Sequence, residues 1–515
     1  MIPIKILTPA EMNRCDQATI QNGLPAIVLM ERAAHSVVHA VLDEMDGVPE
    51  KTLILCGIGN NAGDGLCMAR ELTDLSSDCT VLMTMGLNKL SENAKREFNL
   101  LSKKNCTITT NFQSLENSLH TYDLIVDAIF GTGLDRPIPE SVDAFLEKIN
   151  CTNAYKCAVD VPTGINAYSG SLYSNHPFKA DLTVTFAFPK SGMFFYPARK
   201  TVGKLKCSYI GISNETPETI GWEEKYWMNA QTAKKIQPTA DPDAHKSSMG
   251  RIAVIGGSVH YKGAPLLTLM GALKSGAGMV QGILPSYDHQ MYFTIPPEII
   301  LKEIDASHDY HGMNSLDEIV EYTQDADTLV IGPGMGRAYT TTTFVREFVM
   351  NTEKPLVIDA DGLFAFSSPQ ALELLAKRSG RTILTPHMGE FSRLTGKSIE
   401  QIKANRFGIL KKFAQESGCT VVLKDSTTLI GTSQGQLIVN TTGNEGLACG
   451  GSGDVLAGII GTYLAKGMAP HRAAQLGVYI HGLAADLYKE KHHSSTFTPS
   501  ILCEMLDTAL LTLNR

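Results

Sequence analysis

The chain of 515 residues contains no Walker A sequence, no CxxC pair and no apolar run close to the ~20 residues of a membrane span. The first absence argues against a P-loop as the means of holding phosphates, and the last against a membrane partner. The eleven cysteines are odd in number, and several lie in apolar runs (Cys56, Cys157, Cys419). We therefore expect buried thiols in a reducing compartment, rather than disulfides or a zinc site.

A concentrated basic segment is also missing. Lys and Arg together number 45 against 53 Asp and Glu, which gives a formal net charge of −8. Binding to nucleic acid requires clustered Lys and Arg, so we expect no nucleic-acid partner. Residues 1–5 have neither the basic region nor the apolar core of a signal peptide, and we expect a cytoplasmic protein.

Apolar strand-like runs alternate with helix-like segments through most of the chain. In the first half the runs lie at 53–57, 80–84, 124–127, 158–160 and 184–188. In the second half they lie at 251–255, 279–284, 328–331, 356–358, 382–385 and 420–424, followed by a hairpin at 429–440. This alternation predicts the α/β class, with two domains that each contain a largely parallel sheet and flanking helices.

The alternation lapses between residues 212 and 249. This segment holds both tryptophans, Trp222 and Trp227, and three prolines, and we expect a loop here. We place the domain boundary near residues 215–230, which gives domains of 1–220 and 221–515.

Polar motifs in the first half fall where the predicted strands end. They are residues 60–65 (NNAGDG), Asp127, residues 131–137 (GTGLDRP), Asp160 and Thr163. Ligands bind at this edge of open α/β sheets, so together these motifs predict a nucleotide-sized pocket. Asn61, Asp127 and Thr163 offer only oxygen ligands, which favours a hard cation such as K⁺ or Mg²⁺. Asp160 is either an acid/base group or a structural cap.

The second half contains the glycine-rich stretch 450–454 (GGSGD), followed directly by an apolar helix-like run. Glycine amides at the start of a helix can hold a phosphate, because the N–H groups and the helix dipole both favour an anion. Asp454 would then lie beside the phosphate, where it could take a proton from an attacking hydroxyl. The alternative is a glycine turn with Asp454 as a helix cap.

Three other strand ends in the second half carry candidate residues. Lys424, followed by hydroxyl side chains, suits the phosphates and sugar of a nucleotide, or is a surface lysine before a turn. His387 could stack on or bond to a ligand, or be structural. Asp359 and Asp361 could assist a Mg²⁺-phosphate group or cap the next helix.

In their order along the chain, these motifs resemble the bifunctional NAD(P)H-hydrate repair enzymes. The epimerase part of that family resembles residues 60–65, 126–134 (VDAIFGTGL) and 159–164 (VDVPTG). The dehydratase part resembles residues 332–336 (GPGMG), 359–361 (DAD), 385–390 (TPHMGE) and 444–454. The resemblance covers nearly the whole chain, and it implies a Rossmann-like first domain and a ribokinase-like second domain.

The resemblance also implies residue roles. The hydrated dinucleotide in the first domain would contact Asn60, Asn61, Ala62, Gly63, Asp64, Gly131, Thr132, Gly133, Leu134, Asp135, Arg136, Pro137 and Asp160, and K⁺ would bind Asn61, Asp127 and Thr163. In the second domain the hydrate would contact Ala264, Gly334, His387 and Asp454, and the adenine nucleotide Lys424, Asp425, Ser426, Thr427, Thr428 and Gly453.

The chain departs from the family pattern at several of these positions. Ala62 and Asp425 each replace a glycine, Met388 replaces a proline, and Ser247 follows His245-Lys246 where the family has glycine. The change to Asp425 matters most, because it puts a negative charge near the expected phosphates.

The activity implied by the resemblance has two parts. The first domain interconverts the R and S epimers at the hydrated C6 of the nicotinamide ring, with Asp160 as acid/base. The second uses ADP and Mg²⁺ to phosphorylate the C6 hydroxyl, and elimination then gives NAD(P)H, AMP and phosphate. We also expect a homo-oligomer. The alternatives are a small-molecule alcohol kinase, a nucleotide-binding sensor with degenerate sites, and a partner-binding first domain.

Overall fold

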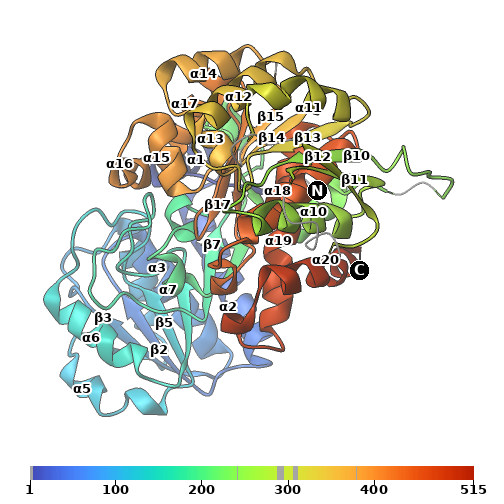
Figure 1. The fold of residues 1–515 in the computed structure, drawn as a ribbon. Helices are drawn as coiled ribbons and strands as arrows, with labels where there is room; N and C mark the ends of the chain where they lie inside the picture. Colours follow the sequence, from blue (N-terminus) through green and yellow to red (C-terminus); the bar gives the residue numbers. More distant parts are fainter. Residues whose placement is uncertain (1–3, 240–241, 287–294, 305–310, 379, 515) are drawn as a thin grey trace. The chain divides into compact units, whose positions relative to one another are not determined.

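The computed structural model describes residues 4–239, 242–286, 295–304, 311–378 and 380–514. The chain forms two compact units: Lys5–Glu223, and the part from Glu224 onward, to which Ile4 also belongs. Each unit contains one sheet with helices on both of its faces, which confirms the α/β class (Figure 1). No helix within the described ranges is both long enough and apolar enough to span a bilayer.

The first unit is built on a seven-stranded sheet in the order β4-β3-β2-β5-β6-β7-β8, in which all neighbours are parallel. The five predicted strands are β2 (Lys51–Cys56), β3 (Asp78–Met83), β5 (Leu124–Ala128), β6 (Tyr155–Val159) and β7 (Leu182–Phe186). The prediction missed the two edge strands, β4 (Thr107–Thr109) and β8 (Lys204–Ser208). The first has only three residues and the second alternates lysine with other residues, so neither is an apolar run.

Helices cover both faces of this sheet. One face carries α2 (Ala26–Met45), α3 (Asn60–Asp74) and α4 (Glu92–Leu101), and the other carries α5 (Gln113–Glu116) and α6 (Glu140–Asn150) (Figure 1). Before them, α1 (Pro9–Gln21) begins with a capping box between Thr8 and Glu11. The short helices are η1 (Leu119–Thr121), η2 (Ser191–Phe194), α7 (Arg199–Val202) and α8 (Thr216–Thr219). Helix α3 begins at Asn60, so the first four residues of the motif at 60–65 form its first turn.

The second unit is built on an eleven-stranded sheet in the order β1-β9-β18-β17-β16-β15-β14-β13-β10-β11-β12. The predicted parallel strands are β10 (Arg251–Ile255), β11 (Met279–Pro285), β13 (Thr328–Ile331), β14 (Leu356–Ile358), β15 (Thr382–Leu384) and β16 (Thr420–Leu423). The predicted hairpin, β17 (Thr428–Gly431) and β18 (Leu437–Asn440), adds antiparallel neighbours. The prediction missed β1 (Ile4–Lys5) and β12 (Ile299–Ile304).

The expected loop at residues 212–249 is partly wrong. It contains strand β9 (Lys225–Met228), which pairs in parallel with β18, and helix α9 (Ala230–Ile236). The strand consists of four residues, KYWM, and begins with a lysine that is fully buried. Pairing within the sheet stabilises this segment, although its sequence is too short for a periodic pattern.

Two layers of helices enclose the second sheet (Figure 1). One face carries α10 (Gly263–Lys274), α18 (Ser452–Ala465), α19 (Pro470–Lys489) and α20 (Pro499–Asn514), and the other α11 (Leu316–Tyr322), α12 (Tyr339–Asn351), α14 (Pro369–Ala376) and α17 (Arg406–Ser417). Short helices at strand ends are α13 (Asp361–Phe364), α15 (Met388–Thr395) and α16 (Ile399–Ala404), with η4 (Met313–Ser315), η5 (Glu445–Leu447) and η6 (Ser494–Thr496).

Glycines allow α10 and α18 to pack closely in the second unit. A Cβ added at Gly458 would lie 2.0 Å from the backbone oxygen of Thr268 and 2.8 Å from the nitrogen of Ala272. We expect Gly458→Ala to lower the free energy of unfolding by about 1–3 kcal/mol, because the helices must move apart. Urea unfolding followed by circular dichroism measures the change. Gly263→Ala, in a helix position with open space around it, is the control; equal stabilities of the two variants would contradict this packing.

Candidate active sites

The first unit has a cavity of about 450 Å³ at the carboxyl ends of its strands. Eight predicted residues line it: Asn60, Asn61, Asp64, Gly131, Thr132, Gly133, Leu134 and Asp160. Ala62 and Gly63 are buried behind it, and Gly63 packs so closely on Met30 that an added Cβ would lie 2.4 Å from the Met30 Cε. Asp135, Arg136 and Pro137 are exposed and are not among the lining residues. These eight residues follow three strands, β2, β5 and β6, whose ends therefore meet at one cavity.

Asp160 lies at the wall of this cavity in a strained conformation. Its φ is 65°, a value that few residues other than glycine, asparagine and aspartate adopt. Its Oδ1 accepts hydrogen bonds from Lys190 Nζ (2.5 Å), Thr185 Oγ1 (3.1 Å) and the Phe186 amide (3.3 Å). Within the described chain its Oδ2 accepts none, so one carboxylate oxygen is anchored and the other is available to a ligand.

Lys190 and Asp16 line the same cavity, and sequence reasoning missed both. The Lys190 side chain is only 1% exposed, and besides Asp160 it donates to Thr185 Oγ1 (2.9 Å). A single lysine at the end of the apolar run after residue 184 was a signal that could have identified it. Asp16, on α1, had no comparable signal, because a charged residue in a helix is ordinary.

Burial raises the pKa of two acids at this cavity. It raises the pKa of Asp16 to about 6, against the opposing effect of Lys190 and with a further increase from the charge of Asp160. It raises the pKa of Asp64 well above its usual value, again with contributions from Asp160 and Asp16. The cavity therefore combines protonatable carboxyl groups with a carboxylate held by a buried lysine.

Of the predicted cation ligands, Asn61 lines the cavity, and Asp127 and Thr163 are fully buried. The buried Asp127 accepts from the Thr163 amide (2.6 Å), Thr163 Oγ1 (2.7 Å) and the Ile129 amide (3.1 Å). Burial raises the pKa of Asp127 to about 6. Asn61 lies beside Gly131, and its buried Nδ2 has no hydrogen-bond partner in the described part of the chain. The Nδ2 is a hydrogen-bond donor and cannot be a cation ligand, so the oxygen ligands on offer to a monovalent cation are Asn61 Oδ1, Asp127 and Thr163.

In the second unit the candidate residues surround the N-terminus of α18. Gly451 caps this helix with a φ of 100°, and Asp454 is its third residue. Burial raises the pKa of Asp454 to about 7; the charge of Asp359 adds to the shift and that of Lys424 opposes it. A carboxyl group that titrates near neutrality can act as a general base.

Lys424 lies over the start of this helix. A Cβ added at Gly453 would lie 3.1 Å from the Lys424 Nζ. The ammonium donates to Asp359 Oδ1 (2.9 Å), which also accepts from Thr385 Oγ1 (2.7 Å). The helix amides and a fixed cation thus share one space, which suits a phosphate. Asp359 anchors the lysine, a role that sequence reasoning did not predict.

Asp425 also has a nearby cation. Its Oδ2 lies 3.9 Å from the Nη2 of Arg406, a largely buried side chain. Arg406 therefore offsets part of the negative charge that the sequence suggested would oppose an anionic ligand. Among the other candidates in this turn, Ser426 is exposed, Thr427 is buried and Thr428 begins β17.

Ala264 and Gly334 lie next to each other at the same edge: a Cβ added at Gly334 would be 3.2 Å from that of Ala264. Asp361 holds the glycine loop after β13 by accepting from the Gly336 amide (3.0 Å). His387 instead caps α15, where its Nδ1 accepts from the Gly389 amide (3.0 Å). The structural alternative for His387 is thus observed, and its Nε2 lies 3.4 Å from Glu390 Oε1.

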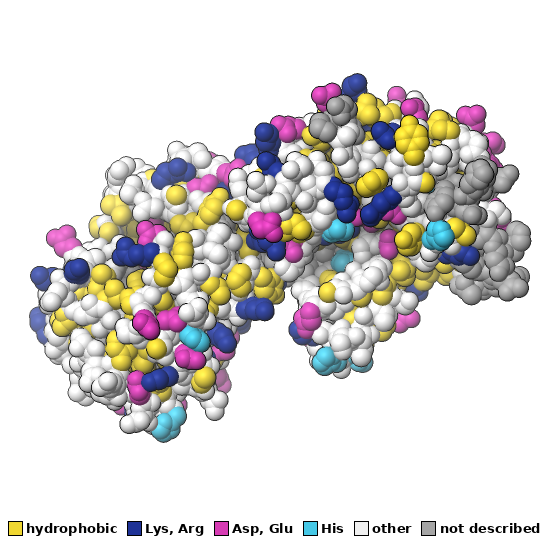
Figure 2. Space-filling view, turned by 60° about the vertical axis from the view of Figure 1, so that its left-hand side comes forward, with side chains coloured by type: hydrophobic (Ala, Val, Ile, Leu, Met, Phe, Trp, Pro, Cys, Tyr) yellow, Lys and Arg dark blue, Asp and Glu magenta, His cyan; other side chains and the backbone are white. Residues whose placement is uncertain are grey.

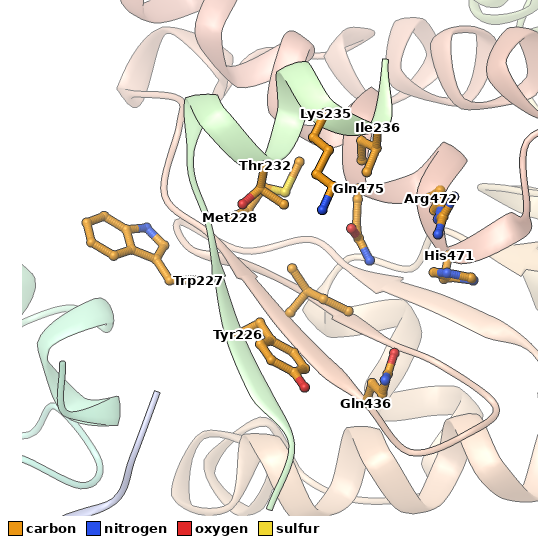
Figure 3. A pocket seen from close by; sticks show the side chains of 11 residues that line it. Tyr226, Trp227, Met228, Thr232, Lys235, Ile236, Gln436, His471, Arg472 and Gln475 are labelled. Atoms are coloured by element: carbon orange, nitrogen blue, oxygen red, sulfur yellow. The ribbon is translucent and has the colours of Figure 1, made fainter. Parts of the chain in front are cut away.

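A separate cavity of about 270 Å³ lies at the opposite edge of this sheet, near the beginning of β18 and α19 (Figure 3). Lys235 and Gln475 reach toward it from α9 and α19, with Tyr226 on β9 at its wall. No predicted site residue lines it.

The face of the molecule in Figure 2 shows acidic and basic side chains interspersed. Within the described ranges, no cluster of three or more His, Cys, Asp and Glu side chains could hold a metal ion.

Comparison with known proteins assigns both units. Residues 252–507 match the family model described as NAD(P)H-hydrate dehydratase, and residues 26–192 match that of the YjeF-related protein N-terminus. The bifunctional NAD(P)H-hydrate repair enzyme Nnr of Thermofilum pendens is 32% identical, with coverage of 98% of this chain and 96% of its own length. The protein of the same name from Moorella thermoacetica is 33% identical, with coverage of 93% and 92%.

A solved structure, the ADP/ATP-dependent NAD(P)H-hydrate dehydratase from Bacillus subtilis co-crystallised with ATP and Mg²⁺, is 27% identical, with a TM-score of 0.48. It covers 55% of this chain and 97% of its own length. The full-length relatives show that this chain belongs to the family of bifunctional NAD(P)H-hydrate repair enzymes.

Proposed function

We propose that this chain repairs hydrated nicotinamide dinucleotides with two activities. Residues 1–220 would interconvert the R and S epimers, and residues 221–515 would dehydrate the S epimer with ADP as co-substrate. The observation that carries the proposal is the position of Asp454 in the first turn of α18, beneath the ammonium of Lys424. A general base, helix amides and a lysine at one point are the parts that phosphoryl transfer requires.

The dehydration proceeds in two steps. Asp454 takes the proton of the C6 hydroxyl as its oxygen attacks the terminal phosphorus of ADP, and the bond to the departing AMP breaks. The C6–O bond then breaks with loss of phosphate, a far better leaving group than hydroxide, and a proton leaves the neighbouring ring carbon to restore NAD(P)H. Amides at Gly451 and Gly453 stabilise the transferring group. Mg²⁺ would arrive with the nucleotide and neutralise the charge of its phosphates.

The contacts that we propose follow the geometry of each site. Lys424, Asp425, Ser426, Thr427, Thr428 and Gly453 would bind the nucleotide, and Ala264, Gly334, His387 and Asp454 the hydrate. In the first unit the residues lining the cavity would bind the hydrated dinucleotide, and Asn61, Asp127 and Thr163 would bind K⁺. We further propose that the protein forms a homo-oligomer and acts in the cytoplasm. Light scattering of the purified protein tests the oligomeric state.

The dehydratase should depend on pH in a defined direction. Asp454 must be ionised to accept a proton, and its pKa is raised to about 7. We therefore expect kcat/KM for dehydration to rise as pH increases through about 7 and then level off. Initial rates with the S epimer at saturating ADP measure the profile. A rate that falls through this interval would contradict the role of Asp454 as base.

Product analysis distinguishes this function from that of an alcohol kinase. With the S hydrate, ADP and Mg²⁺, we expect equimolar NADH, AMP and inorganic phosphate. A stable phosphorylated alcohol that accumulates without NADH would instead indicate an ordinary kinase. Tight binding of ADP with no turnover of the hydrate would indicate a nucleotide sensor.

A further inference from the structure

Three carboxyl groups and one lysine converge on the cavity of the first unit from separate elements. Asp16 comes from α1, Asp64 from α3 and Asp160 from the end of β6, and Lys190 lies just before η2. The family resemblance assigned Asp64 and Asp160 to this site. It assigned no role to Asp16.

The surroundings of Asp16 and Asp160 differ strongly. Asp160 Oδ1 accepts hydrogen bonds from Lys190, Thr185 and the Phe186 amide. Asp16 has no hydrogen bond or ion pair in the described part of the chain, and it is only partly exposed. Two carboxyl groups in one cavity with such different surroundings suit opposite proton-transfer roles.

Epimerisation at C6 requires two such roles. The hydroxyl must leave one face of the ring and oxygen must return on the opposite face. One group must protonate the departing hydroxyl, and another must take a proton from the incoming water. Asp160 can fill only one of these roles in each direction, so the reaction requires a second group at the cavity wall.

We propose that Asp16 is this second group and that it works with Asp160 as an acid–base pair, an inference that rests on the epimerase function proposed above. Asp16 protonates the C6 hydroxyl, the C6–O bond breaks and water leaves, while the ring nitrogen lone pair forms an N1=C6 double bond. Water then attacks C6 from the opposite face, the electron pair returns to N1, and Asp160 takes the proton. The reverse direction exchanges the roles, and a proton passes between the carboxyl groups through water to complete the cycle.

Asp64 is less suited to this role. It is half-buried on α3, and burial raises its pKa well above the usual value, with the charges of Asp160 and Asp16 adding to the increase, which disfavours the ionised form that a base needs. Asp16 has a pKa of about 6, so it can both give and accept a proton under the same conditions. The charged groups that act on Asp16 are Asp64, Asp160 and Lys190.

The test is the rate of conversion of the purified R epimer, followed by chromatographic separation of the two epimers. We expect Asp16→Asn to lower kcat by about 10²-fold or more with little change in KM, since an amide cannot donate the proton. Wild-type kcat/KM should fall as pH rises through about 6. The Asp16→Asn variant should lack this descending limb of the pH profile. Asp16→Glu should restore the limb and part of the rate.

The control is Asp46→Asn, a change of the same charge at the exposed left-handed end of α2, where asparagine is well tolerated. Wild-type kinetics in Asp16→Asn would overturn the inference, as would a loss confined to Asp64→Asn. A loss in Asp16→Asn with the pH limb unchanged would show a structural role and also overturn it. A wild-type protein that does not epimerise the hydrate would contradict the proposed function itself.

Discussion

Asp454→Asn should reduce kcat for ADP-dependent dehydration by about 10²–10⁴, the range for loss of a general base. Asparagine keeps the shape of the side chain but cannot accept the hydroxyl proton. The helix amides and Lys424 remain in place, so the KM for ADP should change little. The return of NADH absorbance from the purified S epimer measures the loss.

Two controls separate this effect from a fold defect. Asp507→Asn alters an exposed acid on α20 of the same unit and should keep the wild-type rate. Epimerisation by the Asp454→Asn protein should also be unchanged, because that site is built entirely from the first unit. A near-normal dehydration rate in this variant would remove Asp454 from the mechanism.

Asp160→Asn should give the second large effect, a loss of epimerisation by about 10²–10⁴. Asparagine tolerates the left-handed φ of 65° at this position, so the backbone should not change. With a mixture of both epimers, this variant should restore NADH only from the S fraction, plus the slow spontaneous conversion of the R fraction. Recovery of the R fraction at the wild-type rate would exclude Asp160 as the acid/base.

Much of the fold could be predicted from the sequence, because buried parallel strands consist of continuous apolar residues. The central strands β2, β5, β13 and β14 were found in this way. The edge strands β1, β4, β8 and β12 and the short strand β9 were missed; β8 alternates lysines with other residues, and β9 has four residues. Their conformation depends on pairing with neighbours, which a local pattern does not contain.

The candidate site residues also fall into two groups, those that could be identified from the sequence and those that could not. Residues in glycine-rich or acidic motifs at strand ends, such as Asn61 and Asp454, could be identified because topology brings strand ends to one edge. Lys190 and Asp16 belong to no motif, and only the tertiary structure brings them to Asp160. From the sequence, Asp359 was expected to assist a Mg²⁺-phosphate group or to cap a helix. In the structure it accepts a hydrogen bond from Lys424, and this contact joins the ends of β14 and β16.

The most direct test of the account uses the whole chain with both epimers of the hydrate at once. Purified protein is incubated with heat-generated NADHX, ADP, Mg²⁺ and K⁺, and the absorbance of NADH is followed to completion. We expect recovery of all the hydrate as NADH, with AMP and phosphate in equal amounts and with dependence on ADP. Recovery that stops when the S fraction is consumed, or that proceeds without ADP, would contradict it.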